Sequence, residues 1–348
     1  MSSDRSPFLD ACRGCNQQHL PVWIMRQAGR YLPEYQEVRK RVSFQQLCRT
    51  PELVAEVVKA PVDRFGFDAA ILFSDILTML EPMGAEVTFP NDGPHIARPI
   101  RTAADVRRLH AIDPSKDLGF VLEAIRQTRT ALPETPLVGF AGSPFTLACY
   151  LIEGGSSKFY NRARRFLHQE RKAAEELIDL LTDMVGLYLR SQVEAGAQAV
   201  QVFESTGGVL SHDDFARFAI EPARRIFEQL DGRKAPRIHF INNVAPYLDL
   251  IRQVECEVIG VDYRLPLASA MKALPNHAIQ GNFNPSALFG TPEGVVRGVN
   301  DMLKGVTDFS RLVVNLGHGI QPETPVDSVA AMVKAVHHYR RQYEYTAG

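Results

Sequence analysis

The sequence predicts a single-domain α/β protein, a (β/α)8 TIM barrel with loop insertions, from three observations. The chain has 348 residues, 45% of them hydrophobic and 23% charged, which is enough to bury a large core. Eight short apolar runs alternate with helical patterns along its whole length, as expected of buried parallel strands joined by helices. The G-x-G-x-x-G loop of a doubly wound sheet, the second fold considered, is missing after the first run.

The eight predicted strands are short, and most of them lack alternation of polar and apolar residues. They are Val22–Met25, Ala69–Phe73, Leu137–Phe140, Ala199–Phe203, Arg237–Ile241, Val258–Val261, Ala278–Gln280 and Leu312–Asn315. Between the second and third strands, Ala85–Phe89 and His95–Ile100 flank Asn91-Asp92-Gly93, which predicts a hairpin insertion. No linker divides the chain, so we expect one domain over residues 1–348, with residues 1–15 as a poorly ordered extension.

Helix starts are marked by small polar residues. Three Thr-Pro pairs place threonine at the N-cap and proline at the first helical position, at residues 50–51, 291–292 and 324–325. Ser211, followed three residues later by Asp214, is a similar start. The clearest apolar helical pattern runs from Leu177 to Tyr188, and this helix is predicted to stop at Gly196.

Charge and cysteine content restrict the class of protein. The 39 Lys+Arg and 40 Asp+Glu residues give a net charge of −1, which argues against non-specific nucleic-acid binding. No run approaches the roughly 18 apolar residues that cross a bilayer, and Met1–Asp10 has no apolar core of a signal peptide. Five cysteines, an odd number, fit a reducing cytoplasm, and Cys12-x-x-Cys15 has no second pair with metal-ligand spacing. We therefore expect a cytoplasmic protein that binds neither nucleic acid nor membrane.

The segment after the first predicted strand is the most informative. Between Arg26 and Arg41 it carries five cations and two anions. Arg26 and Arg30, with Gly29 beside them, would present two guanidinium groups to carboxylates or phosphates at the carboxyl end of the barrel. The alternative is a solvated loop with surface charges.

Two further polar residues follow strands. Asp75 would hold a substrate N–H or a developing cation, or would cap the next helix. His318, between two glycines, is suited to proton transfer or to a structural hydrogen bond with a loop carbonyl. No lysine ends a strand, which counts against a Schiff base, and Glu204-Ser205 lacks the G-x-S-x-G turn of a hydrolase. No His, Cys or carboxylate cluster has metal-ligand spacing.

Four segments resemble one family. Residues 21–35 (PVWIMRQAGRYLPEY) are similar, almost residue for residue, to the N-terminal signature of the uroporphyrinogen decarboxylase family, and residues 139–150 (GFAGSPFTLACY) to its second signature. Residues 71–77 and 315–319 are also similar to family segments. The likeness runs in order from about Pro7 to Tyr343.

The resemblance implies a carboxy-lyase that works without a metal or organic cofactor. Members are (β/α)8 homodimers that remove CO2 from the four acetate side chains of uroporphyrinogen III to give coproporphyrinogen III, a step of porphyrin and haem biosynthesis. By resemblance, the catalytic residues are Asp75, Arg26 and Arg30. The implied substrate-binding residues are Arg26, Gln27, Ala28, Gly29, Arg30, Asp75, Tyr150, Ser205 and His318, with Arg39 and Phe203 as further contacts at the cleft. Family members differ at Thr206, so we expect this residue not to be essential.

Two other functions compete with this one. Zinc-dependent methyltransferases of corrinoid proteins look like the same fold superfamily, but they need a His-x-Cys pair where this chain has His239-Phe240-Ile241. A non-catalytic tetrapyrrole-binding protein on the same barrel is the second alternative.

Overall fold

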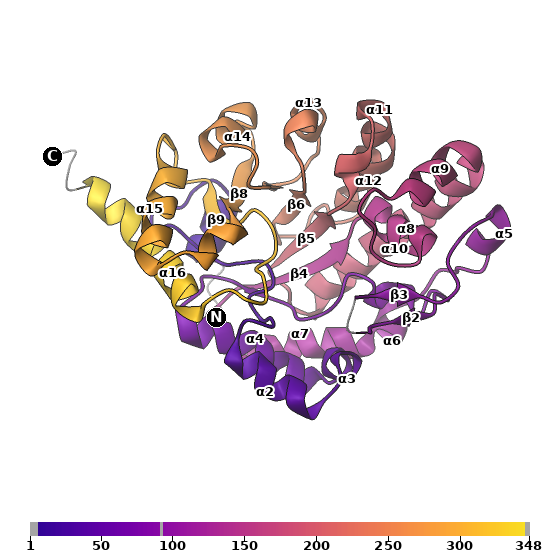
Figure 1. The fold of residues 1–348 in the computed structure, drawn as a ribbon, viewed down its shortest axis with the longest axis horizontal. Helices are drawn as coiled ribbons and strands as arrows, with labels where there is room; N and C mark the ends of the chain where they lie inside the picture. Colours follow the sequence, from indigo (N-terminus) through magenta and orange to yellow (C-terminus); the bar gives the residue numbers. More distant parts are fainter. Residues whose placement is uncertain (1–5, 91–92, 345–348) are drawn as a thin grey trace.

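The computed structural model describes residues 6–90 and 93–344, with no side chains described beyond Tyr339. Its centre is a curled sheet of seven parallel strands in the order β1-β4-β5-β6-β7-β8-β9 (Figure 1). The strands are β1 Ala70–Ile71, β4 Leu137–Gly142, β5 Ala199–Glu204, β6 Arg237–Ile241, β7 Val258–Val261, β8 Ala278–Phe283 and β9 Leu312–Leu316. Every residue of β4, β7, β8 and β9 is buried, which explains why these runs do not alternate.

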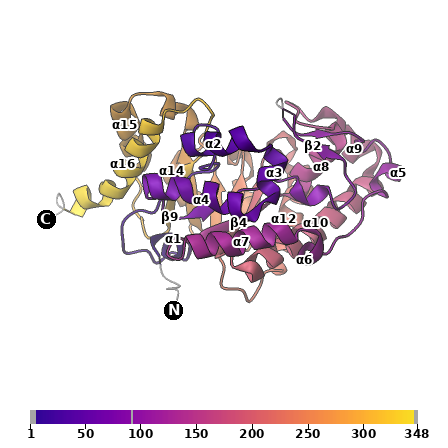
Figure 2. The same ribbon diagram turned by 90° about the horizontal axis from the view of Figure 1, so that it is seen from below.

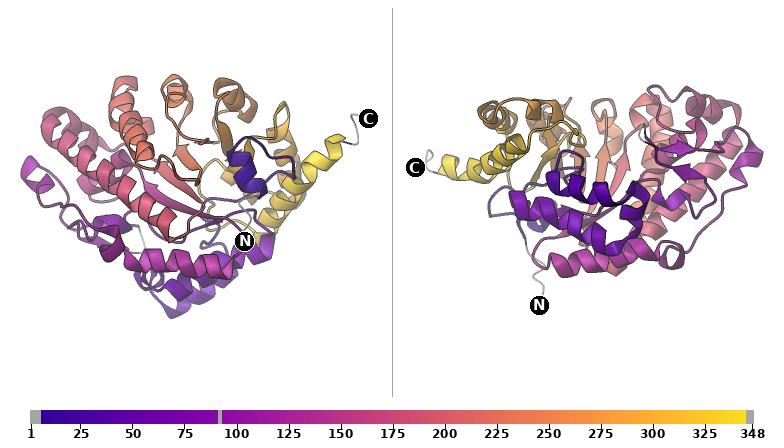
Figure 3. Two further views of the ribbon diagram at one scale, coloured as in Figure 1. Left: turned by 180° about the vertical axis from the view of Figure 1, so that it is seen from behind. Right: turned by 60° about the horizontal axis from the view of Figure 1, so that its bottom comes forward.

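Helices follow the strands and pack on the outside of the sheet (Figures 1 and 3). They are α1 Pro7–Cys12, α2 Pro33–Arg41, α3 Phe44–Arg49, α4 Pro51–Phe65, α5 Ala103–Val106, α6 Pro114–Asp117, α7 Gly119–Ala131, α8 Pro144–Glu153, α9 Asn161–Gln169, α10 Arg171–Ala195, α11 His212–Phe215, α12 Glu221–Glu228, α13 Leu248–Ile251, α14 Leu267–Ala273, α15 Pro292–Leu303 and α16 Val326–Glu344. Figure 2 shows α4 and α7 side by side, and the two helices are packed together. No helix in the described ranges is both long and apolar enough to span a membrane.

The first predicted strand is wrong as a strand. Residues 22–25 make a single parallel bridge, between Val22 and Val314 of β9. On the other side, the N–H of Asp68 donates to the carbonyl of Val22 at 2.9 Å. Beyond this point the backbone N–H groups of Ile24 and Met25 donate to side-chain amide oxygens instead of a neighbouring strand. The segment therefore lies between β9 and the start of β1 without completing a ladder.

The predicted disorder of residues 1–15 is also wrong where the structure describes this segment. Residues 7–12 form α1, whose N-cap Ser6 accepts a hydrogen bond from the N–H of Leu9. Phe8 and Ala11 are fully buried and α1 packs against β9, so burial of apolar side chains orders the segment. The remaining part of the prediction, residues 1–5, lies outside the described residues.

Three other local predictions are confirmed. Strands β2 Val87–Thr88 and β3 His95–Ile96 pair antiparallel as the inserted hairpin, although Asn91 and Asp92 of its turn lie outside the described residues. Ser211 accepts the N–H of Asp214 at the start of α11. Helix α10 ends at Ala195, before Gly196 in the left-handed conformation, with φ of 119°.

Polar side chains cross the interior of the barrel. The indole Nε1 of the fully buried Trp23 donates to Gln280 Oε1 at 3.1 Å, and Gln280 Nε2 donates to Gln201 Oε1 at 2.8 Å. Because these residues come from the segment before β1, from β8 and from β5, the hydrogen bonds link opposite parts of the curled sheet. Each bond satisfies polar groups that would otherwise be costly to bury.

Candidate active site

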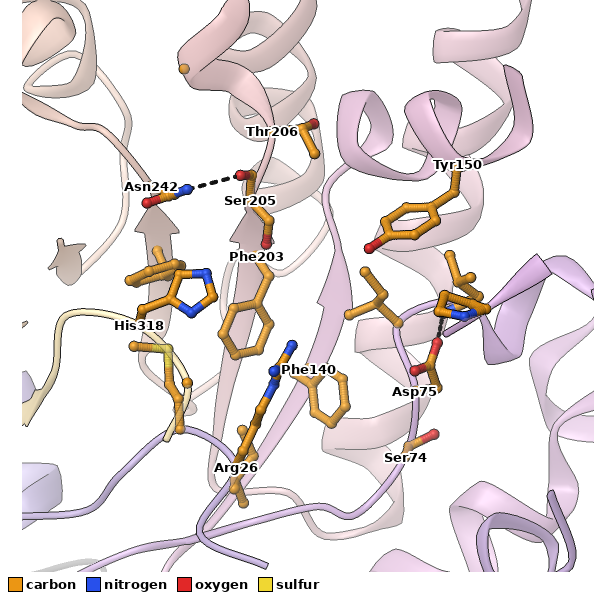
Figure 4. A pocket seen from close by; sticks show the side chains of 18 of the residues that line it. Arg26, Ser74, Asp75, Phe140, Tyr150, Phe203, Ser205, Thr206, Asn242 and His318 are labelled. Carbon is orange, nitrogen blue, oxygen red and sulfur yellow. Dashed lines mark hydrogen bonds between the residues drawn. The ribbon is translucent and has the colours of Figure 1, made fainter. Parts of the chain in front are cut away.

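Two adjoining cavities, of about 670 and 770 Å3, open at the carboxyl ends of the strands. Both are lined by Phe73, the last residue of the second predicted strand, and by residues that follow the first and second predicted strands, namely Arg26, Ala28, Ser74, Asp75 and Pro94. We call the two cavities together the cleft. Figure 4 shows the first cavity, with Asp75 and Tyr150 on one side, His318 and Asn242 on the other, and Arg26 extending between them.

The structure brings together ten of the eleven residues predicted for the site. The first cavity is lined by Arg26, Ala28, Asp75, Tyr150, Phe203, Ser205 and His318. The second adds Gly29, Arg30 and Arg39. Residues separated by more than 290 positions in the sequence therefore meet, because the ends of parallel strands lie on one face of the barrel.

The exception is Gln27, whose side chain is fully buried and lines neither cavity. Its Oε1 accepts the N–H of Ile24, and its Nε2 donates to the carbonyl of Ala69. The side chain of Gln27 is therefore not brought into the cleft with the other predicted site residues. This amide replaces the missing strand ladder and holds the loop that carries Arg26.

Arg26 occupies a constrained backbone position, with φ of 66°. A Cβ atom at Gly29 would lie 2.6 Å from the carbonyl oxygen of Arg26, so only glycine fits there. A Cβ atom at Gly319 would lie 2.6 Å from Arg26 Cδ. Gly29 thus leaves room for the Arg26 carbonyl, and Gly319, from another loop, leaves room for the arginine side chain that enters the cleft.

Asp75 stabilises its own turn and faces the cleft, but it does not cap the next helix, a short 3-10 turn at Thr78–Leu80 whose N-cap residue is Leu77. Its Oδ1 accepts the N–H of Leu77 at 2.8 Å, whereas its Oδ2 has no hydrogen bond to any described residue. Burial raises the pKa of Asp75 above its usual value, against the lowering effects of the Leu77 hydrogen bond and the charge of Arg26. One carboxylate oxygen is left for a ligand in a poorly hydrated environment.

Tyr150 and His318 keep their neutral forms over a wide pH range. Burial, followed by the charge of Asp75, raises the pKa of Tyr150. Burial, followed by the charges of Arg26 and Arg264, lowers the pKa of His318. A phenol and a neutral imidazole are both able to donate hydrogen bonds to an anion.

The cleft is strongly cationic although the chain as a whole is not. Among the described lining residues there are six cations, Arg26, Arg30, Arg39, Lys40, Lys158 and Arg264, and one carboxylate, Asp75. Opposite charges elsewhere in the chain give the net charge of −1. This arrangement favours a ligand with several negative charges.

Aromatic rings form an apolar wall of the first cavity. Phe203 stands edge-on to Phe140 and to Phe240, with ring centroids 5.6 and 5.7 Å apart. All three rings line the cavity, together with Ile71 and Leu72. The wall suits an apolar macrocycle whose charges lie on its periphery.

Sequence reasoning did not select Phe140, Phe240, Asn242 or Arg264, which all line the first cavity. Phe140 and Phe240 lie within predicted strands, where inward and outward positions alternate, so period alone did not show which phenylalanines face the cavity. Asn242 directly follows β6, and Arg264 comes shortly after β7. Their place just beyond the carboxyl end of a strand was the sequence signal that could have identified them.

A buried carboxylate supports the loop that carries Ser205. Glu204 is fully buried, and its pKa is raised by that burial. Its oxygens accept bonds from the hydroxyls of Ser143 and Thr146 at 2.6 and 2.8 Å, and from the N–H groups of Thr206 and Gly207 at 3.1 and 2.8 Å. Four donors, two from the start of α8 and two from the segment after β5, therefore converge on one side chain outside the cleft.

One group among the described residues has metal-binding side chains close together. The ligand atoms of His19, Asp68 and His337 lie within 4.8 Å of one another, near the amino end of the sheet and away from the cleft. The two Nε2 atoms lie 2.6 and 2.8 Å from the carboxylate oxygens. Two ligands of one zinc ion would be about 3.3 Å apart, so this geometry is that of two hydrogen bonds.

His239 stands where corrinoid methyltransferases need a zinc ligand, but its surroundings are not those of a metal site. His239 is fully buried, and its ring stands edge-on to that of Phe227. Burial lowers its pKa to about 3. Within the described part of the chain neither ring nitrogen has a hydrogen-bond partner, and Ile241 occupies the place of the thiolate.

Comparison with known proteins assigns the family. Residues 3–339 match the model of the uroporphyrinogen decarboxylase (URO-D) family. The chain is 45% identical to the uroporphyrinogen decarboxylase of Syntrophotalea carbinolica, covering 95% of this chain and 96% of that protein. It is 43% identical to that of Carboxydothermus hydrogenoformans, with 95% of both proteins covered.

A solved methyltransferase from Methanosarcina mazei shares the fold, with a TM-score of 0.79 over 96% of this chain and 98% of that one. Its sequence identity is only 22%, so the likeness is one of architecture. The family model and the relatives, by contrast, span nearly the whole chain at substantial identity, with Arg26, Asp75 and His318 together in one cleft. The chain belongs to the uroporphyrinogen decarboxylase family.

Proposed function

We propose that the chain is a uroporphyrinogen decarboxylase, a carboxy-lyase that converts uroporphyrinogen III to coproporphyrinogen III without a cofactor. The observation that carries the proposal is the cleft, which is lined by six cations, a single half-buried carboxylate and an aromatic wall. Relatives at 43–45% identity that carry the same activity in their names support it.

The chemistry needs a place for the electron pair of the breaking carbon–carbon bond. Protonation of a pyrrole ring carbon creates an iminium-like cation, which accepts that pair as CO2 leaves. The resulting exocyclic methylene takes up a proton to become the methyl group, and the ring carbon loses its proton. Each acetate therefore consumes one proton and releases one CO2.

In this proposal Asp75 accepts hydrogen bonds from pyrrole N–H groups through its free Oδ2 and stabilises the ring cation. The low hydration that raises its pKa also strengthens this interaction. Arg26 and Arg30 hold carboxylates of the substrate. Arg26 is the candidate for carrying the proton, although a guanidinium group is a poor acid.

The remaining site assignments follow the lining of the cleft. Tyr150, Ser205 and His318 contact the substrate, and their hydroxyl and imidazole groups suit its carboxylates or N–H groups. Arg39, Ala28 and Gly29 border the second cavity, where peripheral side chains of the macrocycle would lie. Phe203 packs against the ring system.

The test is turnover. The purified chain is incubated anaerobically with uroporphyrinogen III, with and without EDTA, and the loss of carboxyl groups is followed by chromatography. We expect stepwise loss of four carboxyl groups, unchanged by the chelator. Binding of uroporphyrinogen without loss of carboxyl groups would identify a tetrapyrrole-binding protein. Loss of carboxyl groups that EDTA abolishes would show that the reaction depends on a metal.

We also propose a homodimer in the cytoplasm. The family resemblance supports the dimer, and five cysteines without disulfides support a reducing compartment. Sedimentation at micromolar concentration tests the dimer, because a mass near the 38.8 kDa of one chain would contradict it.

A further inference from the structure

Arg264 lies at the carboxyl end of the barrel, in the loop between β7 and α14, and lines the same cavity as Asn242 and His318. Its side chain is 48% exposed, whereas that of the neighbouring Asp262 is 1% exposed. An exposed guanidinium group thus stands on a buried carboxylate at the surface of the cleft.

The hydrogen bonds of Arg264 engage only one of its nitrogens. Nη1 donates to Asp262 Oδ1 and to Asn242 Oδ1, both at 3.1 Å. The group also lies over the ring of Tyr263, 4.6 Å from the centroid. These contacts fix the plane of the guanidinium.

The other edge of the group remains open. Nε and Nη2 of Arg264 have no hydrogen bond to any residue in the described ranges. These two parallel N–H groups are the edge that binds a carboxylate with two bonds. Asp262 does not depend on the guanidinium group of Arg264 for all its hydrogen bonds. Its Oδ2 accepts the backbone N–H of Val244 at 2.8 Å, and its Oδ1 accepts the backbone N–H of Arg264 at 2.9 Å.

The neighbourhood suits an anion. His318 lies within the electrostatic influence of both Arg26 and Arg264, and burial together with these two charges keeps its imidazole neutral. Asn242 also connects Arg264 to the loop that carries Ser205, since its Nδ2 donates to the Ser205 carbonyl at 3.2 Å (Figure 4). These hydrogen bonds therefore fix the position of the open edge of Arg264 relative to Ser205 in the cleft.

We propose that Arg264 binds a side-chain carboxylate of the tetrapyrrole through its Nε and Nη2 atoms, on the His318 side of the cleft. The proposal rests on the proposed function, which supplies the polycarboxylate. It adds a second anchoring point, distinct from the Arg26–Arg30 segment. A macrocycle held at both points is restrained from rotating while an acetate lies near Asp75.

The alternative is that Arg264 only connects loops, and three variants separate the two roles. R264Q removes the charge and the paired donors, and R264K keeps a cation for Asp262 but lacks the paired donors. R252Q removes an arginine from the exposed end of α13, outside the cleft, as the matched control. The measurements are uroporphyrin binding by fluorescence, steady-state turnover of uroporphyrinogen III, and thermal unfolding.

For R264Q we expect about tenfold weaker uroporphyrin binding and a similar rise in KM, with kcat within threefold of the wild type. R264K should show at least a fivefold loss of affinity while unfolding at the wild-type temperature, and R252Q should match the wild type. If R264Q does not fold, R264K decides the question.

Affinity within twofold of the wild type in folded R264K would overturn the proposal, as would a fall in kcat and in melting temperature with an unchanged KM. If the wild-type chain turns over uroporphyrinogen and the variants bind normally, only the role of Arg264 fails. If the wild type neither binds uroporphyrin nor releases CO2, the proposed function itself fails.

Discussion

Gly319 lies directly against Arg26, so that a Cβ atom at position 319 would come within 2.6 Å of Arg26 Cδ. Gly319 follows His318 in the loop after β9, whereas Arg26 follows the segment that bridges to the same strand. The missing side chain of one loop thus provides the path by which a cation of another loop reaches the cleft.

Gly319→Ala should therefore push the Arg26 guanidinium out of position. We expect KM for uroporphyrinogen to rise five- to tenfold, with less than about 1 kcal/mol lost from the free energy of unfolding, since a flexible side chain gives way. Steady-state kinetics and urea unfolding measure the two quantities. Gly119→Ala, at a helical position with open space around the added methyl group, is the control. An unchanged KM in Gly319→Ala would contradict the steric argument.

Asp75→Asn keeps an oxygen for the N–H of Leu77 but removes the negative charge. Because the ring cation would lose its counter-charge, we expect kcat to fall by at least about a hundredfold, while uroporphyrin still binds within about threefold of wild-type affinity. Single-turnover CO2 release and fluorescence binding measure these changes. A variant with near-normal kcat would show that Asp75 has another role.

The raised pKa of Asp75 also predicts a pH dependence. Burial raises this pKa above the value of an ordinary aspartate, which is about 3.9. As pH falls, the carboxylate is therefore protonated, and turnover is lost, at a higher pH than for an ordinary aspartate. A folded-state pKa above the unfolded one means that ionisation of Asp75 costs stability, and that this cost grows as pH rises through the folded pKa. Asp75→Asn should thus unfold at the same or a higher temperature than the wild type at pH 7. A clearly lower melting temperature would argue against this linkage.

Asp68 shows the opposite behaviour. Burial alone would raise its pKa, but hydrogen bonds with His19 and His337 hold the pKa below its usual value. Its contribution to stability is therefore present above the unfolded pKa and is lost as pH falls through the folded one. Asp68→Asn should lower the free energy of unfolding by about 1–3 kcal/mol at pH 7, and by less in acid.

Urea unfolding at pH 7 and in acid measures the effect of Asp68→Asn. The exposed Asp301→Asn should leave stability unchanged at both pH values. Equal losses for Asp68→Asn across the whole pH range would indicate that the shape of the side chain, and not its charge, matters.

Glu204→Ala should leave four hydrogen-bond donors without their acceptor. We expect a loss of about 3 kcal/mol in the free energy of unfolding, whereas Glu204→Gln, which keeps one carbonyl oxygen, should lose about 1 kcal/mol. The exposed Glu228→Gln serves as the control in the same denaturation experiment. Similar stabilities for Glu204→Ala and the wild type would mean that Ser143 and Thr146 find other acceptors.

Much of the site was predictable because it depends on positions along the chain. Apolar runs mark the strands, and polar residues just beyond them must gather at one end of a parallel barrel, which is how Arg26, Asp75 and His318 were found. The family resemblance added Tyr150, Ser205 and the more distant contacts. Capping of α11 and the end of α10 at Gly196 depend on neighbouring residues alone, and both predictions were confirmed.

The sequence by itself determined the class of fold, the order of its units and the family, because apolar spacing, caps and motifs are local properties. Only the tertiary structure decided which polar groups face the substrate. It turned the side chain of Gln27 inward to replace a strand ladder, placed Arg264 on a buried aspartate, and gathered three phenylalanines into one wall. The direction of each such side chain depends on hydrogen bonds and packing with residues from other loops, and these partners meet only when the barrel has formed.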